Sequence, residues 1–214
     1  MKYELIIFDM DGTILNTLED LKNSMNHALK THNLPERSLE EIRNFVGNGI
    51  RTLIERAVPK NTSSEIMESV YETFLPYYKL HSSDFTRPYE HINDLLAELK
   101  NRGYKTAVVS NKAHAAVLDL CVQYFDGLFD LAIGERPEIA KKPAPDMVHL
   151  ALQKMNVPKE KAVYIGDSDV DVATAKNSGL DMIAADWGFR DREILEAQGA
   201  EIIVSDPMEI LELI

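Results

Sequence analysis

Five short apolar segments, each ending at small or polar residues, constrain the fold more than any other feature of the chain. They are residues 3–8, 105–109, 131–133, 162–165 and 182–185. Helical patterns fill most of the intervals, over residues 91–101, 113–124, 145–155 and 170–178. Strands that alternate with helices of this length predict a mostly parallel sheet with helices on both faces. Ligands of such sheets bind where the strands end.

Residues 16–84 interrupt this alternation. They contain four amphipathic helical patterns, over residues 18–31, 39–45, 50–57 and 64–78. Between Phe8 and Lys105, no segment has the pattern of a further core strand. The fold class predicted is therefore α/β: a Rossmann-like parallel sheet with helices on both faces, plus an inserted α-helical cap domain. Residues 1–15 and 85–214 are expected to form the discontinuous core, and residues 16–84 the cap.

The charge balance limits the possible partners. The chain has 23 basic and 35 acidic residues, a net charge of -12, and the acids are scattered along it. Nucleic acid is therefore not expected as a partner. A negative protein also repels anionic substrates at long range, so a phosphate site needs a local positive field from a metal, a lysine or backbone N–H groups. The apolar run Leu5–Phe8 is too short for a signal peptide or a membrane span, so we expect a cytoplasmic protein without a membrane partner.

Two acids, Asp9 and Asp11, follow the first apolar segment directly and precede Gly12 and Thr13. This order places both carboxylates in a tight loop where the strand ends. Two like charges so close together cost energy unless a positive group lies beside them. Asp-Gly near a strand end is also a common turn signal, so the segment alone is equally compatible with a simple turn.

A second acidic group, Gly166-Asp167-Ser168-Asp169-Val170-Asp171, follows another apolar segment and opens a helix. Ser168 or Asp169 could serve as helix caps, but capping does not readily explain three carboxylates within five positions. Together with Asp9 they form an oxygen-rich set of the kind that Mg²⁺ prefers. The six histidines form no recognisable zinc pair with the single cysteine, Cys121.

Ser110, Asn111 and Lys142 complete the candidate residues. Ser110 and Asn111 end the second apolar segment and could offer a hydroxyl and loop N–H groups to a phosphoryl oxygen, although such residues commonly end strands. Two prolines follow Lys142 and restrict the backbone there, which favours a fixed lysine near the strand ends over a solvated loop lysine.

With these residues in this order, the chain resembles the haloacid-dehalogenase-like superfamily of phosphotransferases, in its branch with a small helical cap. The resemblance covers essentially the whole chain. Within the superfamily, Val46-Gly47-Asn48-Gly49-Ile50-Arg51 and Lys142-Pro143-Ala144-Pro145-Asp146 look most like phosphoglycolate phosphatases, whose relatives include pyrophosphatases and sugar-phosphate phosphatases. Asn16 departs from the pattern, since these relatives often carry Asp at this hinge position.

The resemblance implies a Mg²⁺-dependent phosphatase that acts on a small phosphorylated metabolite. Asp9 would attack phosphorus and become an aspartyl-phosphate, and Asp11 would act first as acid and then as base. Ser110 and Lys142 would hold the transferring oxygens. The metal ligands implied are Asp9, the backbone carbonyl of Asp11, and Asp167, with Asp171, and less so Asp169, orienting them.

Substrate contacts are expected from both parts of the chain. Thr13 and Asn111 would contribute from the core. Gly47, Asn48, Gly49 and Arg51 would contribute from the cap, where Arg51 could pair with a substrate carboxylate or could simply be an exposed helix residue.

Three other functions fit the sequence less well. A dehalogenase needs neither a metal nor an acid at Asp11, so Asp11 and Asp167 argue against it. A phosphomutase would keep every catalytic residue and differ in how the cap retains an intermediate. A non-enzymatic protein that binds a phosphorylated ligand would be indicated by a lost catalytic carboxylate, and none is lost. The sequence does not indicate the oligomeric state.

Overall fold

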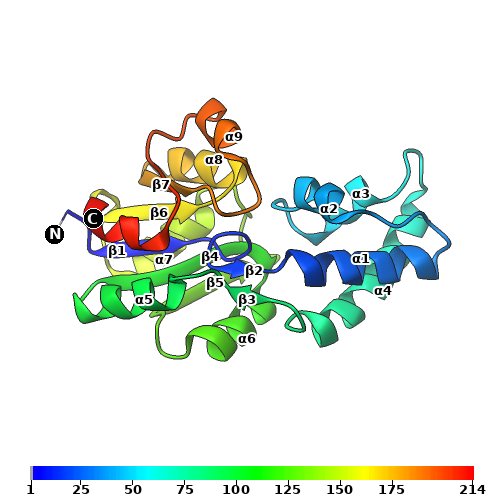
Figure 1. Ribbon diagram of the computed structural model, residues 1–214, viewed down its shortest axis with the longest axis horizontal. Helices are drawn as coiled ribbons and strands as arrows, with labels where there is room; N and C mark the ends of the chain where they lie inside the picture. Colours follow the sequence, from blue (N-terminus) through cyan, green and yellow to red (C-terminus); the bar gives the residue numbers. More distant parts are fainter. Residues whose placement is uncertain (1) are drawn as a thin grey trace. The chain divides into compact units, whose positions relative to one another are not determined.

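The computed structural model describes residues 2–214, which form two compact units (Figure 1). One contains the described residues up to Leu15 together with Pro88–Ile214, and the other contains Asn16–Arg87. The chain therefore crosses between the units twice. At these crossings the short strands β2 (Leu15–Asn16) and β3 (Arg87–Pro88) pair with each other.

The larger unit is built on a six-stranded parallel sheet. In spatial order its strands are β5 (Leu131–Glu135), β4 (Lys105–Ala113), β1 (Leu5–Phe8), β6 (Ala162–Gly166), β7 (Asp181–Ala185) and β8 (Ile203–Val204). The central strand β1 pairs with both β4 and β6, so Phe8 lies opposite Val108 on one side and Ile165 on the other. Every residue of β1 is buried, which explains its unbroken apolar sequence.

Helices cover both faces of this sheet, which confirms the predicted fold class (Figure 1). Ile6 and Phe8 of β1 belong to one core with α5 and α6, whereas Leu5 and Ile7 belong to a second core with α7 and α8. This division follows from the alternation of side chains along a strand. The four helices are α5 (Ile92–Asn101), α6 (His114–Phe125), α7 (Asp146–Met155) and α8 (Asp169–Ser178).

Strand β4 extends beyond its predicted end. The sequence indicated a strand ending at Val109, but the backbone stays extended through Ala113, with a register shift against β5 between these two residues. Ser110, Asn111 and Lys112 are buried within this extension. The C-terminal part also contains elements without a predicted counterpart besides β8, namely α9 (Arg192–Ala197), α10 (Ile210–Leu213), and the 3₁₀ turns η1 (Lys159–Lys161) and η2 (Pro207–Glu209).

The smaller unit is helical. It contains α1 (Leu18–Thr31), α2 (Leu39–Phe45), α3 (Ile50–Ala57) and α4 (Ser64–His81). Only the end of α4 differs from the sequence prediction, by running past Tyr78. The buried carboxylate of Asp20 accepts hydrogen bonds from the backbone N–H groups of Phe85 and Thr86 and from the Thr86 hydroxyl, so it fixes the returning chain against α1. Within residues 2–214, no helix has the length and apolar character needed to cross a membrane.

Candidate active site

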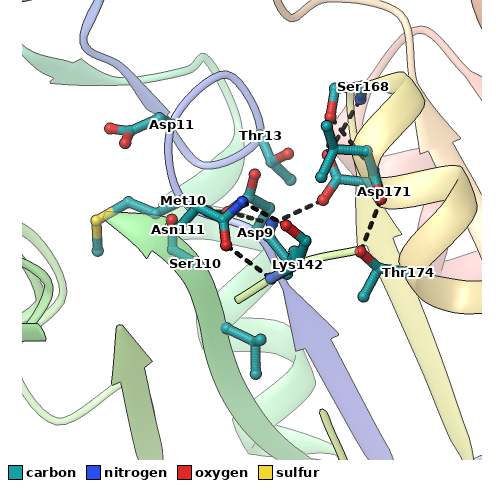
Figure 2. Close-up of polar contacts among 12 residues, drawn as sticks. Asp9, Met10, Asp11, Thr13, Ser110, Asn111, Lys142, Ser168, Asp171 and Thr174 are labelled. Atoms are coloured by element: carbon teal, nitrogen blue, oxygen red, sulfur yellow. Dashed lines mark hydrogen bonds and ion pairs between the residues drawn. The ribbon is translucent and has the colours of Figure 1, made fainter. Parts of the chain in front are cut away.

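The carboxyl ends of β1, β4 and β6 bring the predicted residues of the larger unit together (Figure 2). Asp9 leaves β1 with its N–H donating to the Ile165 carbonyl at 2.9 Å, which holds it beside the end of β6. Ser110 lies on β4, and Asp167 follows β6 directly. Because these three strands are neighbours in the sheet, residues more than 150 positions apart in sequence meet at one edge.

The loop after Asp9 is a tight turn closed by its own backbone. The N–H groups of Thr13, Ile14 and Leu15 all donate to the Met10 carbonyl. Gly12 has a φ of 91°, in the left-handed region, and a Cβ atom placed there would lie 2.2 Å from Oδ2 of Asp167. A glycine is therefore required at this position both by the turn and by the close approach of Asp167.

Asp9, Asp167 and Asp171 form a buried cluster of carboxylates. Each offers an oxygen atom within 4.8 Å of the others. Burial raises the pKa of Asp9 to about 6 despite the opposing charge of Lys142, and burial together with the neighbouring carboxylates raises the pKa of Asp167 to about 8. These shifts show that burial disfavours the charged forms of both carboxylates more than their protein partners favour them.

Lys142 lies inside this cluster rather than in solvent. Its ammonium group contacts Asp9 Oδ1 at 2.9 Å and Asp171 Oδ1 at 2.8 Å, and donates to the Tyr164 hydroxyl at 3.0 Å. Burial alone would lower the pKa of Lys142, but the charges of Asp171 and Asp9 raise it well above its ordinary value. A buried cation with two carboxylate partners excludes the solvated-loop alternative for this lysine.

Asn111 holds the backbone of Lys142. Its side-chain amide donates to the Lys142 carbonyl at 3.0 Å, and its side-chain oxygen accepts from the Lys142 N–H at 2.8 Å (Figure 2). Ser110 is almost fully buried, and its hydroxyl oxygen accepts from the N–H of Lys112. Asn111 is thus joined to Lys142 by two hydrogen bonds, and Ser110 directly precedes Asn111 on β4.

Asp167 and Asp171 are fixed by different partners. Asp167 accepts the Thr13 hydroxyl at 2.7 Å and the N–H of Phe189 at 2.8 Å. Asp171 forms a reciprocal cap with Ser168 at the start of α8, and its second oxygen faces Lys142. Asp169 points elsewhere, because its carboxylate pairs with Arg190 at 3.0 Å and is 41% exposed.

Asp11 is held apart from the three-carboxylate cluster. Its carboxylate pairs with the buried ammonium group of Lys112 and, in Figure 2, is directed away from Asp9. Lys112 and Tyr164 both escaped the sequence interpretation. Lys112 directly follows Ser110 and Asn111, so predicting a longer strand there would have included it. Tyr164 is the one hydroxyl-bearing residue in its otherwise apolar strand.

The residues predicted in the cap lie in the smaller unit. Gly47 and Gly49 have positive φ angles of 114° and 84°, and with Asn48 they form the turn before α3. The Arg51 guanidinium donates to both carboxylate oxygens of Glu68, at 2.7 and 3.2 Å, and lies over the Tyr71 ring, 4.1 Å from its centroid. Arg51 therefore forms an exposed two-point ion pair within the smaller unit, with side chains 59% and 49% exposed.

Comparisons with known proteins match nearly the whole chain. A model of the family described as haloacid dehalogenase-like hydrolase matches residues 6–185. A phosphoglycolate phosphatase of Aquifex aeolicus (strain VF5) is 31% identical over 98% of this chain and 95% of its own length. The pyrophosphatase PpaX of Bacillus cereus (strain Q1) is 28% identical over 100% of this chain and 97% of its own.

Solved structures with the same fold also match over nearly the whole chain. A crystal structure from Lactobacillus delbrueckii subsp. bulgaricus, provisionally assigned as a phosphoglycolate phosphatase, has a TM-score of 0.95 and 38% sequence identity, and the match covers 100% of this chain and 98% of that one. A predicted phosphoglycolate phosphatase from Haemophilus somnus 129PT has a TM-score of 0.93 at 28% identity, with 100% and 98% covered.

Proposed function

Since the chain belongs to the haloacid dehalogenase-like hydrolase family, we propose that it is a phosphatase that hydrolyses small phosphorylated metabolites through a phosphorylated intermediate on Asp9. The observation that carries this proposal is the position of the Asp9 carboxylate. It lies at the end of the central strand, in contact with the buried ammonium of Lys142 and within the cluster formed with Asp167 and Asp171.

The donor set fits a Mg²⁺ ion. All three clustered groups are carboxylates, the ligand type that this hard cation prefers. Burial raises the pKa values of Asp9 and Asp167, so a cation beside them would favour their charged forms, and Gly12 and Gly188 leave room where a Cβ atom would strike Asp167. Asp9, Asp167 and the backbone carbonyl of Asp11 would hold the ion. When bound, it would reduce the repulsion between the Asp9 carboxylate and a phosphate dianion.

The chemistry of this chain's own residues follows in two steps. An oxygen of Asp9 attacks phosphorus, the bond from phosphorus to the leaving oxygen breaks, and Asp11 gives that oxygen a proton. Asp11 then takes a proton from water as the water oxygen attacks phosphorus, which breaks the bond to Asp9 and releases inorganic phosphate. The contacts of Asp9 Oδ1 with Lys142 and with the Met10 N–H fix the orientation of the nucleophile before the reaction.

Ser110 and Lys142 are the groups proposed to hold the transferring phosphoryl oxygens. Both are buried at the end of the sheet next to Asp9, and Lys142 supplies the local positive charge that an anionic substrate needs in a chain of net charge -12. Asp171 would act by orienting Lys142, because it contacts the lysine directly and is itself anchored by Ser168. Thr13 and Asn111 would contribute by positioning Asp167 and Lys142.

The activity test is release of inorganic phosphate from an aryl phosphate with Mg²⁺ and with excess chelator. We expect activity to require Mg²⁺ and to be lost in Asp9→Asn, because the amide cannot act as the nucleophile. Asp169→Asn is the matched control and should remain active, since that carboxylate is 41% exposed and pairs with Arg190. Activity that persists in Asp9→Asn, or without Mg²⁺, would refute the mechanism.

For the substrate, we propose a phosphorylated small carboxylic acid of the phosphoglycolate type. The relatives named phosphoglycolate phosphatase support this choice, and Arg51, which now pairs with Glu68, would be the residue that exchanges this partner for the substrate carboxylate. A pyrophosphatase is the second candidate, because other relatives carry that name. Ranking 2-phosphoglycolate, pyrophosphate and hexose phosphates by kcat/KM would separate the two, and recovery of all product phosphorus as inorganic phosphate would exclude a phosphomutase.

Arg51 provides a specific test of carboxylate recognition. We expect Arg51→Ala to raise KM for 2-phosphoglycolate by at least about 10-fold, the loss of a charge-assisted pair, with little effect on 4-nitrophenyl phosphate, which has no carboxylate. Glu68→Gln is the matched variant, since it removes the charge that competes for Arg51 and should lower the same KM. Equal effects on both substrates would contradict the carboxylate-binding role.

A further inference from the structure

Lys112 forms a buried ion pair with the acid that the proposed mechanism uses for proton transfer. Its Nζ lies 2.9 Å from Oδ1 and 3.2 Å from Oδ2 of Asp11. The Lys112 side chain is only 3% exposed, whereas that of Asp11 is 22% exposed. The ammonium group thus approaches the carboxylate from the protein side and contacts both of its oxygens, which fixes the position of the carboxylate more closely than a single contact would.

The extension of β4 explains how Lys112 reaches this position. Ser110, Asn111 and Lys112 are consecutive residues of extended, buried backbone. Successive side chains of an extended strand point in opposite directions. Asn111 accordingly faces the Lys142 backbone, while Lys112 faces Asp11. The extended backbone, where the sequence suggested a loop, thus directs these two neighbouring side chains toward different partners.

The two acids of the Asp9-Met10-Asp11 segment therefore each have a separate buried cation. Lys142 contacts Asp9, and Lys112 contacts Asp11. Lys112 contacts both carboxylate oxygens of Asp11, so its removal would leave this partly exposed side chain freer to turn toward solvent. A proton donor must lie within hydrogen-bond reach of the leaving oxygen, so a change in this orientation affects proton transfer directly.

From this geometry we propose that Lys112 is a positioning residue that holds the Asp11 carboxyl group where it can serve the leaving oxygen. The inference rests on the proposed phosphatase function, because that function gives Asp11 its role. Lys112 itself exchanges no proton and forms no bond with phosphorus. Its contribution is to limit the conformations of Asp11, so it should matter most in the step that needs the Asp11 proton.

Leaving groups of different basicity make this role measurable. An alkoxide is a strong base and departs with a proton from Asp11, whereas 4-nitrophenolate is a weak base and departs without one. The value of kcat/KM reports the steps up to departure of the leaving group. A positioning defect at Asp11 should therefore reduce kcat/KM selectively for alkyl phosphates, and a general disturbance of the site should reduce it equally for both classes.

The experiment compares wild type, Lys112→Met, Lys112→Arg and Asp11→Asn on 4-nitrophenyl phosphate and on whichever of 2-phosphoglycolate and glycerol 3-phosphate wild type hydrolyses faster. We expect Lys112→Met to lower the alkyl-to-aryl ratio of kcat/KM by about 100-fold or more, in the range typical of general acid catalysis. Lys112→Arg should recover part of this loss. The double variant with Asp11→Asn should be no worse than Asp11→Asn alone, because both changes remove the same function.

Three controls separate this inference from the proposed function. Lys141→Met removes an exposed lysine of the segment before Pro143 and should leave the ratio unchanged. If Lys112→Met does not fold, the alkyl-to-aryl ratio is measured in Lys112→Arg, where a smaller reduction is expected, and compared with that in Asp11→Asn. An unchanged ratio in the Lys112 variants overturns the positioning role while Asp9→Asn stays inactive, whereas an active Asp9→Asn overturns the phosphatase mechanism itself.

Discussion

At the scale of single residues, the site depends on glycines as much as on charged groups. The Asp167 carboxylate lies where Cβ atoms of Gly12 and Gly188 would be, 2.2 and 2.4 Å from the nearest carboxylate atom. Any side chain at these positions would displace the carboxylate. The sequence indicated Gly12 as part of a turn, but this steric requirement follows only from the distant Asp167.

Gly12→Ala tests this requirement, with Gly103→Ala as its matched control. Both glycines have positive φ angles, 91° and 81°, so each substitution should cost about 1–2 kcal/mol of unfolding free energy for the backbone conformation alone. Only Gly12→Ala also meets another group, because the Cβ position of Gly103 has no neighbour within 4 Å. We expect urea denaturation to show both losses and phosphatase assays to show a loss of activity in Gly12→Ala only. Equal activities in the two variants would contradict this account.

Some residues of the site could be identified from sequence patterns and others could not. Asp9, Ser110 and Asp167 were identified because each follows an apolar segment, and Lys142 because two prolines after it restrict the backbone. The structure brings all four to one edge of the sheet. Lys112 was missed because a lysine after Ser-Asn was taken as part of a loop. The partners of a charged group, such as Asp11 for Lys112, are set by tertiary contacts between residues 101 positions apart.

At the scale of elements, prediction succeeded where the pattern was long and periodic. The helices of residues 16–87 and the strands β1, β6 and β7 lie close to their predicted ranges. Prediction failed at β8, which has two residues and thus too few for a periodic signal, and at the end of β4, where polar residues are buried. Asn111 and Lys112 find their partners in other segments, at Lys142 and Asp11, so the usual association of polarity with loops does not hold there.

A contact at the start of α5 predicts a pH dependence of stability. His91 precedes this helix, and its Nδ1 atom lies 2.7 Å from Asp206 Oδ2, beside η2. The hydrogen bond with Asp206 raises the pKa of His91 above its ordinary value of 6.5. A raised pKa in the folded state means that the contact stabilises the fold fully below about pH 6.5 and that this contribution is lost as the pH rises through the folded-state value.

His91→Asn should therefore destabilise the protein at pH 5.5 and have a smaller effect at pH 9. Asparagine tolerates the left-handed backbone of this residue, which has a φ of 62°, so the comparison isolates the side-chain pair. Urea denaturation at the two pH values measures the difference. Asp206→Asn, which leaves the histidine without its partner, should show the same trend; a His91→Asn effect that does not vary with pH would exclude the pair as its cause.

At the scale of the whole molecule, the buried acids link metal binding to folding. A ligand that binds only the folded state stabilises it by mass action. The carboxylates of Asp9 and Asp167 come together only in the folded chain, because they leave different strands of the sheet. Their mutual repulsion is a cost of folding that a bound cation would remove.

We therefore expect Mg²⁺ to raise the thermal midpoint in a concentration-dependent way, by several degrees at saturating ion. A stabilisation of about 2.7 kcal/mol, reached at 100 times the dissociation constant, is sufficient for such a shift. Differential scanning fluorimetry at matched ionic strength, with NaCl as control, measures it without any enzyme assay. Asp167→Asn should abolish the shift and Asp169→Asn should keep it. A shift of equal size in NaCl would mean that the effect is not specific binding.

The way in which the helical unit joins the sheet also affects how such proteins can change over time. Residues 16–87 leave and re-enter the larger unit at paired strands, and just outside them the Tyr89 N–H donates to the Ile14 carbonyl at 3.2 Å. Because the two ends of this insert are hydrogen-bonded neighbours, the larger unit requires only that the inserted segment begin and end close together. Recombination could therefore exchange the whole segment as one piece, and the larger unit would keep Asp9 and its partners unchanged while the protein acquired a different inserted unit.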